Sequence, residues 1–240
     1  MEKSFLFNFE ERPHCIIANS NKKFPLRRIF CVGANYVAHA VEMGRNPDRD
    51  PPFFFSKPSD AIVNADSSIS ASIPYPAQTN DLHYEVELVV AIGKKGKDLD
   101  IDKSLDLVWG YSVGIDLTRR DLQQEAKAKR RPWDLSKGFD NSAIIGMIYP
   151  VSELGHPFNS NIWLSVNGKG KQNSNTSKLI WSVAEVISFL TQSVSLSPGD
   201  LIYTGTPEGV GPIAKGDKIK AGIDDINAVS YTHLTLPTKA

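Results

Sequence analysis

Residues 83–92 read HYEVELVVAI, and they hold both the strongest strand signal and the strongest chemical signal of the chain. The aliphatic, largely β-branched run from Leu88 to Ile92 predicts a buried strand. Glu85 and Glu87 stand two residues apart at its start, and alternate residues of a strand point to the same face. Two adjacent buried carboxylates are costly unless one is protonated or a cation neutralises both. Because hard divalent cations prefer oxygen ligands, the pair indicates a Mg²⁺ or Mn²⁺ site.

Asp116 is the best candidate for a third metal ligand. It lies near the end of residues 108–117, whose sequence VWGYSVGIDL predicts another apolar strand, and an ionised carboxylate there needs a partner. Three carboxylates would leave positions of an octahedral ion open for water and a chelating substrate. A second reading stays open: one glutamate faces solvent and Asp116 caps the following helix.

Composition excludes several classes of function. The 27 basic and 27 acidic side chains cancel, so no global field attracts nucleic acid or an anionic membrane. No apolar run approaches the length of a membrane span, and the first residues lack the pattern of a signal peptide. Cys15 and Cys31 show no metal-type spacing and fit a reducing compartment as small apolar residues. We therefore expect a cytoplasmic protein without nucleic-acid or membrane partners.

Many short strand-like segments with few helices and no regular alternation of the two predict a mixed, β-rich α+β fold. This pattern argues against a Rossmann fold or an α/β barrel. We expect strands over residues 29–32, 53–55, 84–92, 108–117, 162–166 and 201–204, and helices over residues 36–43, 119–129 and 179–192.

The chain divides into three parts by sequence pattern. Residues 1–27 predict an N-terminal β-rich extension, and residues 28–226 predict one catalytic domain. Residues 227–240 lose the β pattern and read as a non-native tail, so the fold predictions exclude them.

Three further groups point to acid–base and anion chemistry. His39 and Glu42 are neighbours on a helix, which suits a general base for water, although such a pair is more often only a surface contact. Lys137 follows an aromatic, irregular segment, where it either pairs with a substrate oxyanion or is solvated. In residues 205–212, GTPEGVGP, backbone N–H groups and the Thr206 hydroxyl either bind an anion or form only a tight turn. These glycines do not match a nucleotide-binding pattern.

Together these motifs resemble the fumarylacetoacetate hydrolase family. The matching motifs cover roughly residues 28–226 and are, in chain order, VGANYxxHxxEM, FxKP, HYEVEL, GxDLTRRDLQ, KGFD and TGTPxGVGP. Within the family, the RRDLQ helix and residues 46–55 are most similar to bacterial fumarylpyruvate hydrolases and related acylpyruvate hydrolases. The resemblance implies a mixed β-roll around a barrel-like sheet, with a few short helices, in a homodimer.

The resemblance also implies three groups of site residues. The metal ligands, for Mg²⁺ or Mn²⁺, would be Glu85, Glu87 and Asp116; the catalytic residues would be His39, Glu42, Lys137 and Gln123; the substrate-binding residues would be Arg120, Thr206 and Tyr84.

The implied reaction is hydrolysis of a carbon–carbon bond in a β-diketo acid. Fumarylpyruvate or a related acylpyruvate would give pyruvate and a carboxylic acid such as fumarate, a reaction of aromatic catabolism. One alternative is decarboxylation of oxaloacetate, or isomerisation of a keto acid, at the same metal site. Another is a non-catalytic binding protein, against which the intact set of costly charged residues argues.

Two departures from the family pattern affect these expectations. Many relatives have arginine where this chain has Ala34, which removes a charge near the helix that carries His39. The family also closes with a strand after Ile226, where the atypical tail begins, and its loss would expose a sheet edge.

Overall fold

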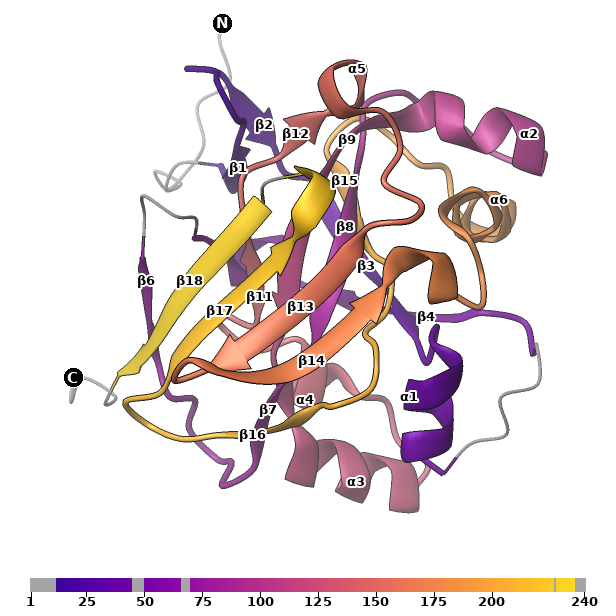
Figure 1. Ribbon diagram of the computed structural model, residues 1–240. Helices are drawn as coiled ribbons and strands as arrows, with labels where there is room; N and C mark the ends of the chain where they lie inside the picture. The colour runs from indigo at the N-terminus through magenta and orange to yellow at the C-terminus, as the bar shows by residue number, and fades with distance from the viewer. Residues whose placement is uncertain (1–11, 45–49, 66–69, 227, 236–240) are drawn as a thin grey trace, which may run out of the picture.

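The computed structural model describes residues 12–44, 50–65, 70–226 and 228–235 (Figure 1). Its main feature is a large, mixed sheet that curls into a half-barrel, with a second sheet in front of it and few short helices around both (Figure 1). The predicted β-rich mixed fold is therefore confirmed.

The larger sheet carries strands from most of the chain. Its members are β3 (Arg28–Gly33), β4 (Phe53–Lys57), β5 (Ile62–Asn64), β8 (Val86–Ile92), β9 (Val108–Asp116), β11 (Ala143–Ile145) and β15 (Asp200–Tyr203), with β12 (Tyr149–Pro150) added on β9. They lie in the order β4-β3-β15-β8-β9-β11-β5. Strands β8 and β9 are antiparallel, whereas β3 pairs with β15, and β5 with β11, in parallel.

Three smaller sheets complete the β structure. The five-stranded sheet has the order β14-β13-β17-β18-β6 and consists of β6 (Ala71–Pro74), β13 (Asn161–Val166), β14 (Lys169–Asn175), β17 (Lys218–Ile223) and β18 (Ala228–Thr235). The other two are β1 (His14–Ile16) with β2 (Lys23–Pro25), and β7 (Leu82–Tyr84) with β10 (Thr118–Arg119) and β16 (Gly211–Ile213).

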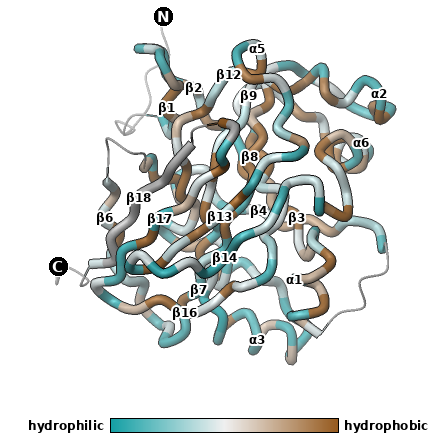
Figure 2. The backbone as a smooth tube through the Cα atoms, viewed as in Figure 1, coloured by the Kyte–Doolittle hydropathy of each residue, from teal (hydrophilic) through white to brown (hydrophobic). Residues whose placement is uncertain are grey.

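The helices are short and lie at the margins of the sheets (Figure 1). They are α1 (Val37–Glu42), α2 (Ile101–Ser104), α3 (Arg120–Ala128), α4 (Asp134–Lys137), α5 (Val151–Leu154) and α6 (Val183–Ser193). Helix α3 is mostly hydrophilic, as Figure 2 shows, which matches its polar sequence. No helix among the described residues is long and apolar enough to cross a membrane.

Helix α6 begins later than the hydrophobic spacing predicts. Ser182 caps it through a capping box, in which its hydroxyl accepts from the Glu185 N–H and Glu185 reaches back to the Ser182 N–H. Residues 176–178 form a separate 3-10 turn, so the expected start at residue 179 was wrong. The local cap decides the boundary here, because it satisfies the first free N–H groups of the helix.

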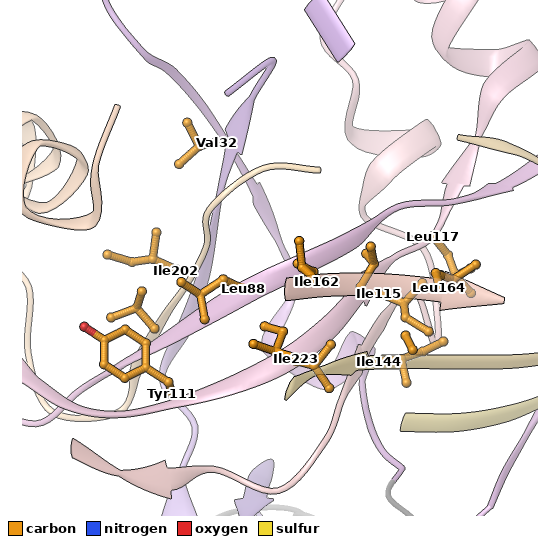
Figure 3. Packing of buried hydrophobic residues seen from close by; sticks show 14 of the residues in the cluster. Val32, Leu88, Tyr111, Ile115, Leu117, Ile144, Ile162, Leu164, Ile202 and Ile223 are labelled. Carbon is orange, nitrogen blue, oxygen red and sulfur yellow. The ribbon is translucent and has the colours of Figure 1, made fainter. Parts of the chain in front are cut away.

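The main core lies between the large sheet and the five-stranded sheet. Leu88 and Ile115 from the large sheet share this core with Ile162, Leu164 and Ile223, as Figure 3 shows. Burial of these side chains is the main favourable contribution to the stability of the fold.

A second core covers the opposite face of the large sheet. Val89 and Tyr203 pack there with Phe24 and Leu26 from residues 12–27. Every residue of β8 is therefore buried, because both faces of its sheet are covered. This explains the continuous apolar run that the sequence shows after Glu87.

The two cysteines belong to this second core. Cys15 and Cys31 are free and buried. Burial raises the pKa of the Cys15 thiol to about 12, and it raises the pKa of Cys31 well above its ordinary value. Both act as small apolar residues rather than as reactive thiols.

The C-terminal segment forms part of the five-stranded sheet. Strand β18 pairs antiparallel with β17, with Ala221 opposite Ser230, and parallel with β6. The expectation that the chain loses its closing strand and exposes a sheet edge is thus wrong. Residues 228–235 form this strand and pair with both β17 and β6. Backbone hydrogen bonds require no particular side chains, so a segment without a clear β pattern still completes a sheet. The division of the chain into an N-terminal extension (residues 1–27), a catalytic domain (residues 28–226) and a non-native tail (residues 227–240) remains a prediction.

Truncation after Ile226 is expected to destabilise the protein by about 3 kcal/mol, which for a chain of this size lowers the Tm by roughly 6–12 °C. The physical reason is the loss of two strand pairings and the exposure of the β17 and β6 edges. Calorimetry measures the Tm, and truncation after Thr235, which keeps β18, is the matched control. Equal Tm values for the two truncated chains would contradict a structural role for β18.

Candidate metal and active site

Three buried carboxylates meet where β8 and β9 lie side by side. Glu85 precedes β8, Glu87 is its second residue, and Asp116 ends β9. The Asp116 N–H donates to the Glu85 carbonyl at 2.8 Å, which fixes the two chains at this point. One ligand atom from each of the three side chains lies within 4.8 Å of the others. The structure thus brings together the three residues that the sequence indicates as metal ligands.

Two alternatives from the sequence are wrong. Glu85 is 5% exposed and Glu87 is 1% exposed, so neither glutamate faces solvent. Helix α3 has Arg119 at its N-cap without a side-chain cap, so Asp116 does not cap it.

Lys137 and Arg120 neutralise Glu85. The ammonium of Lys137 donates to Glu85 Oε2 at 2.8 Å and to Asp116 Oδ2 at 2.7 Å. Arg120 donates through Nη2 to Glu85 Oε1 at 2.5 Å. Burial alone would raise the pKa of Glu85, but the charges of Lys137 and Arg120 hold it well below its ordinary value. Lys137 is buried at the end of α4, so the reading of a solvated loop lysine is wrong.

Glu87 has a different electrostatic environment. Burial and the charges of Asp116 and Glu85 raise its pKa well above the ordinary value. Its Oε2 accepts a hydrogen bond from the Gly205 N–H at 2.7 Å. Gly205 has a φ of 102°, a conformation that favours glycine, and this lets its N–H point at the carboxylate. No cationic side chain in the described part of the chain forms an ion pair with Glu87.

The donor set fits a hard divalent cation. Lys57 Nζ lies 2.7 Å from Asp116 Oδ1 and forms an ion pair with it, and it also donates to the carbonyls of Leu117 and Lys137. Glu87 has no such ion pair among the described residues, and burial beside two other carboxylates raises its pKa. A divalent cation among these three oxygen ligands would stabilise the ionised form of Glu87.

His39 and Glu42 form the expected pair on α1. His39 Nδ1 lies 3.1 Å from Glu42 Oε2, and the imidazole is buried. The other oxygen of Glu42 accepts from the Gly209 N–H at 3.2 Å, so the carboxylate is held from two sides. With Glu42 ionised, Nδ1 carries the hydrogen, which leaves Nε2 as the basic nitrogen.

One small cavity brings most of the predicted site residues together. Those that line it are His39, Glu85, Glu87, Arg120, Gln123, Lys137 and Thr206. Of the others, Glu42 reaches the cavity through His39, and Asp116 through the carboxylate cluster.

Tyr84 is not among the residues that line this cavity. It is buried beneath residues 205–212, where a Cβ atom on Gly211 would lie 2.9 Å from its hydroxyl. Burial and the charge of Glu42 raise the pKa of Tyr84, so its phenol lies near the pair of His39 and Glu42. The substrate-binding role of Tyr84 remains a prediction.

An aromatic wall of the cavity was missed from the sequence. Phe53, Phe55 and Trp133 line it, with the ring centroids of Phe53 and Trp133 5.5 Å apart. Residues 53–55 enter the sequence-based expectations as a strand and as part of the family resemblance, without a place in the site. Their period of two, which places Phe53 and Phe55 on one face, is the signal that could have found this wall.

Lys57 was also missed as a site residue. Its side chain is fully buried, and it sits between Asp116 and the backbone carbonyls of Leu117 and Lys137. Its motif, FxKP, served only as part of the resemblance. The available signal was a lysine at the end of an apolar strand, where a charge needs a buried partner.

Comparison with known proteins gives consistent matches. The family model described as fumarylacetoacetate (FAA) hydrolase C-terminal matches residues 28–232. The solved fumarylpyruvate hydrolase from Pseudomonas aeruginosa, in complex with Mn²⁺ and pyruvate, has a TM-score of 0.95 and 46% identity, over 98% of this chain and 100% of that one.

Two relatives with different activities are similar to this chain at nearly the same level. The fumarylpyruvate hydrolase of Ralstonia sp is 43% identical over 79% of this chain and 97% of its own length. The mitochondrial oxaloacetate decarboxylase of Dictyostelium discoideum is 41% identical over 84% of this chain and 90% of its own length.

Replacement of Lys57 by methionine is expected to lower the free energy of unfolding by about 3 kcal/mol, because it leaves the buried Asp116 with one fewer cationic neighbour. Lys103→Met is the matched control, since Lys103 is 65% exposed and lies 3.9 Å from Asp100. We expect the control to change stability by less than about 0.5 kcal/mol. Urea unfolding measures the free energy of unfolding of both variants. Equal changes in the two would argue against a structural role for Lys57.

Proposed function

Because the chain belongs to the fumarylacetoacetate hydrolase family, we propose that it is a metal-dependent hydrolase that cleaves a carbon–carbon bond of an acylpyruvate. Fumarylpyruvate is the leading substrate. The observation that carries the proposal is the position of His39 and Lys137 on the same cavity as the buried carboxylates.

Glu85, Glu87 and Asp116 would hold the metal ion, Mg²⁺ or Mn²⁺. When bound, the ion would supply Lewis-acid stabilisation of negative charge on the keto-acid oxygens of the substrate. The similar P. aeruginosa enzyme, which holds Mn²⁺ and pyruvate, supports this choice of metal and of product.

His39 is the proposed base. Glu42 holds its Nδ1–H, so Nε2 takes a proton from a water molecule in the cavity, and the water attacks the distal carbonyl carbon of the substrate. The link from Glu42 to Gly209 holds the pair against residues 205–212.

Gln123 would donate to the oxyanion that this attack creates. Lys137 would stabilise it by its positive charge, because its three hydrogens go to Glu85, Asp116 and Thr118. Arg120 donates to Gln123 Oε1 at 2.6 Å, which leaves the amide hydrogens of Gln123 for the substrate. Such preorganised donors typically contribute about 10²–10³ in rate each. Collapse of the oxyanion breaks the carbon–carbon bond. The electron pair of this bond leaves with the pyruvate part as its enolate, which then takes up a proton.

The cavity also supplies groups for the substrate carboxylate. Arg120 and Thr206 line the cavity and would bind this carboxylate, whereas Phe53, Phe55 and Trp133 would contact the acyl chain. An anionic keto acid with a planar tail matches this combination of charge and aromatic surface.

Decarboxylation of oxaloacetate is the second candidate function, supported by the 41% identity to the D. discoideum enzyme. Loss of CO₂ requires no base that activates water. The contact between His39 and Glu42 therefore favours hydrolysis.

The proposal extends to the setting of the protein. It would act in the cytoplasm as a homodimer, in the catabolism of aromatic compounds, with a small anionic keto acid as partner. The balanced charge of the chain and the family resemblance support this extension.

The direct test is an assay with fumarylpyruvate and Mg²⁺ or Mn²⁺. We expect loss of the diketo-acid absorbance with equal release of pyruvate and fumarate, and no activity in excess chelator.

Glu87→Gln is expected to weaken Mn²⁺ binding in calorimetry by more than about 100-fold, because it replaces a proposed ligand. Mutation of a residue that only contacts a metal ligand already lowers metal affinity by about 10- to 100-fold. Glu153→Gln, at an exposed carboxylate of α5, is the matched control. Full activity in chelator would contradict the metal site, and faster CO₂ release from oxaloacetate would favour the second function.

His39→Ala is expected to lower hydrolysis by about 10²- to 10⁴-fold, because it removes the base. Mn²⁺ binding should not change, since His39 is not a proposed ligand. His14→Ala, in β1, is the control. Normal hydrolysis by the His39 variant would exclude His39 as the base, but it would not contradict the proposed metal site.

A further inference from the structure

Gln172 is a buried amide that no part of the predicted site includes. It lies in β14, at one end of the five-stranded sheet, and is 1% exposed. Residues of β14 alternate between exposed and buried at this point, and Gln172 points inward together with Ser174. A buried amide destabilises a fold unless its hydrogen bonds are made, so its partners are informative.

The amide of Gln172 is fully hydrogen-bonded. Its Oε1 accepts from the Val86 N–H at 3.0 Å, and its Nε2 donates to Thr206 Oγ1 at 2.9 Å and to the Pro207 carbonyl at 2.8 Å. The amide can take only this orientation, because a flipped amide would place Oε1 against the Pro207 carbonyl and Nε2 against the Val86 N–H.

These contacts join two parts of the candidate site. Val86 lies between Glu85 and Glu87, so the first contact fixes the backbone between two proposed metal ligands. Thr206 lines the cavity, so the second contact fixes a proposed substrate-binding hydroxyl. Gln172, a side chain from a different sheet, therefore sets the position of the Thr206 hydroxyl relative to the backbone between the two glutamates.

The contact with Thr206 also sets the direction of its hydroxyl hydrogen. A hydroxyl offers one hydrogen and two lone pairs. Since Thr206 Oγ1 accepts from Gln172, one lone pair is occupied and the hydrogen points elsewhere. In the described part of the chain no acceptor takes this hydrogen, and Thr206 lines the cavity, so a ligand there can accept it. A hydroxyl that accepts one hydrogen bond is also a better donor of the next.

We propose that Gln172 is a positioning residue, which acts through Thr206 to present a hydroxyl hydrogen to the carboxylate of the keto-acid substrate. The inference rests on the proposed function, in which Thr206 binds that carboxylate. It predicts that the effect of Gln172 depends on the presence of the Thr206 hydroxyl.

A double-mutant cycle with Gln172→Met and Thr206→Val tests this dependence. Methionine keeps the length of the side chain without its hydrogen bonds, and valine keeps the shape of threonine without the hydroxyl. We expect each single variant to raise the KM for fumarylpyruvate by about tenfold or more, since a hydrogen bond to a charged group is lost. The kcat should change by less than about threefold. Most of the effect of Gln172→Met on KM should disappear in the Thr206→Val background, because the two residues act as one unit on the substrate carboxylate; the part that remains reports the lost contact with the Val86 N–H.

Two further variants separate positioning from a general loss of structure. Gln172→Glu keeps the acceptor for the Val86 N–H, but it puts a carboxyl oxygen against Thr206 Oγ1 and the Pro207 carbonyl, where the amide of Gln172 donated. Thr206 then loses its donor, so we expect the same rise in KM. Ser174→Ala changes the neighbouring inward residue of β14 and should leave KM unaltered. Thermal unfolding of every variant shows whether it is folded.

A Gln172 effect on KM that persists in full in the Thr206→Val background would overturn the proposal, and so would an unchanged KM in Gln172→Glu. If the wild-type protein hydrolyses no acylpyruvate, the proposed function fails. The cycle is then measured as calorimetric binding of pyruvate in the presence of Mn²⁺. There, a loss of affinity that is not additive supports the positioning role, and an additive or absent loss overturns it.

Discussion

Mutual neutralisation of buried charge is the constraint on which the rest of this structure depends. An ionised carboxylate in apolar surroundings carries a desolvation cost of tens of kcal/mol when nothing compensates it. The three carboxylates, of Glu85, Glu87 and Asp116, are all buried, so cationic groups have to lie beside them. The chain supplies three, each also buried: Lys57, Arg120 and Lys137. Such pairs add little to net stability, but loss of one partner is costly, and this holds the surrounding elements in a single arrangement.

The fold meets this constraint with rigid elements from distant parts of the sequence. Strands β8 and β9 present the carboxylates, whereas the cations come from the end of β4 and from the helices α3 and α4. Cores on both faces of the large sheet hold these elements in place. Glu87 is left without a cation of its own in the described chain, and burial beside Asp116 and Glu85 raises its pKa, so a bound cation would stabilise its ionised form.

Local signals predicted local features well. Most of the strand expected over residues 84–92 is β8, although the chain leaves the strand at Glu85, between β7 and β8. The pairing of His39 with Glu42 and the approximate position of α3 also follow from spacings within one element. Features that depend on a partner elsewhere were missed. The backbone pairing of β18 is one example, and the aromatic wall of the cavity is another. Lys57 and Gln172 are polar residues in strands, and a sequence alone does not show that their partners lie on other sheets or helices.

The sequence by itself indicated that Glu85 and Glu87 lie close together at the start of a buried strand, because alternate residues of an extended chain point to the same side. It also determined the family, through motifs whose order and identity match. Only the tertiary structure decided which cations meet these carboxylates, and which aromatic side chains line the cavity beside them. The physical reason is that burial and charge state depend on neighbours from distant segments. Those neighbours meet only when both cores have packed.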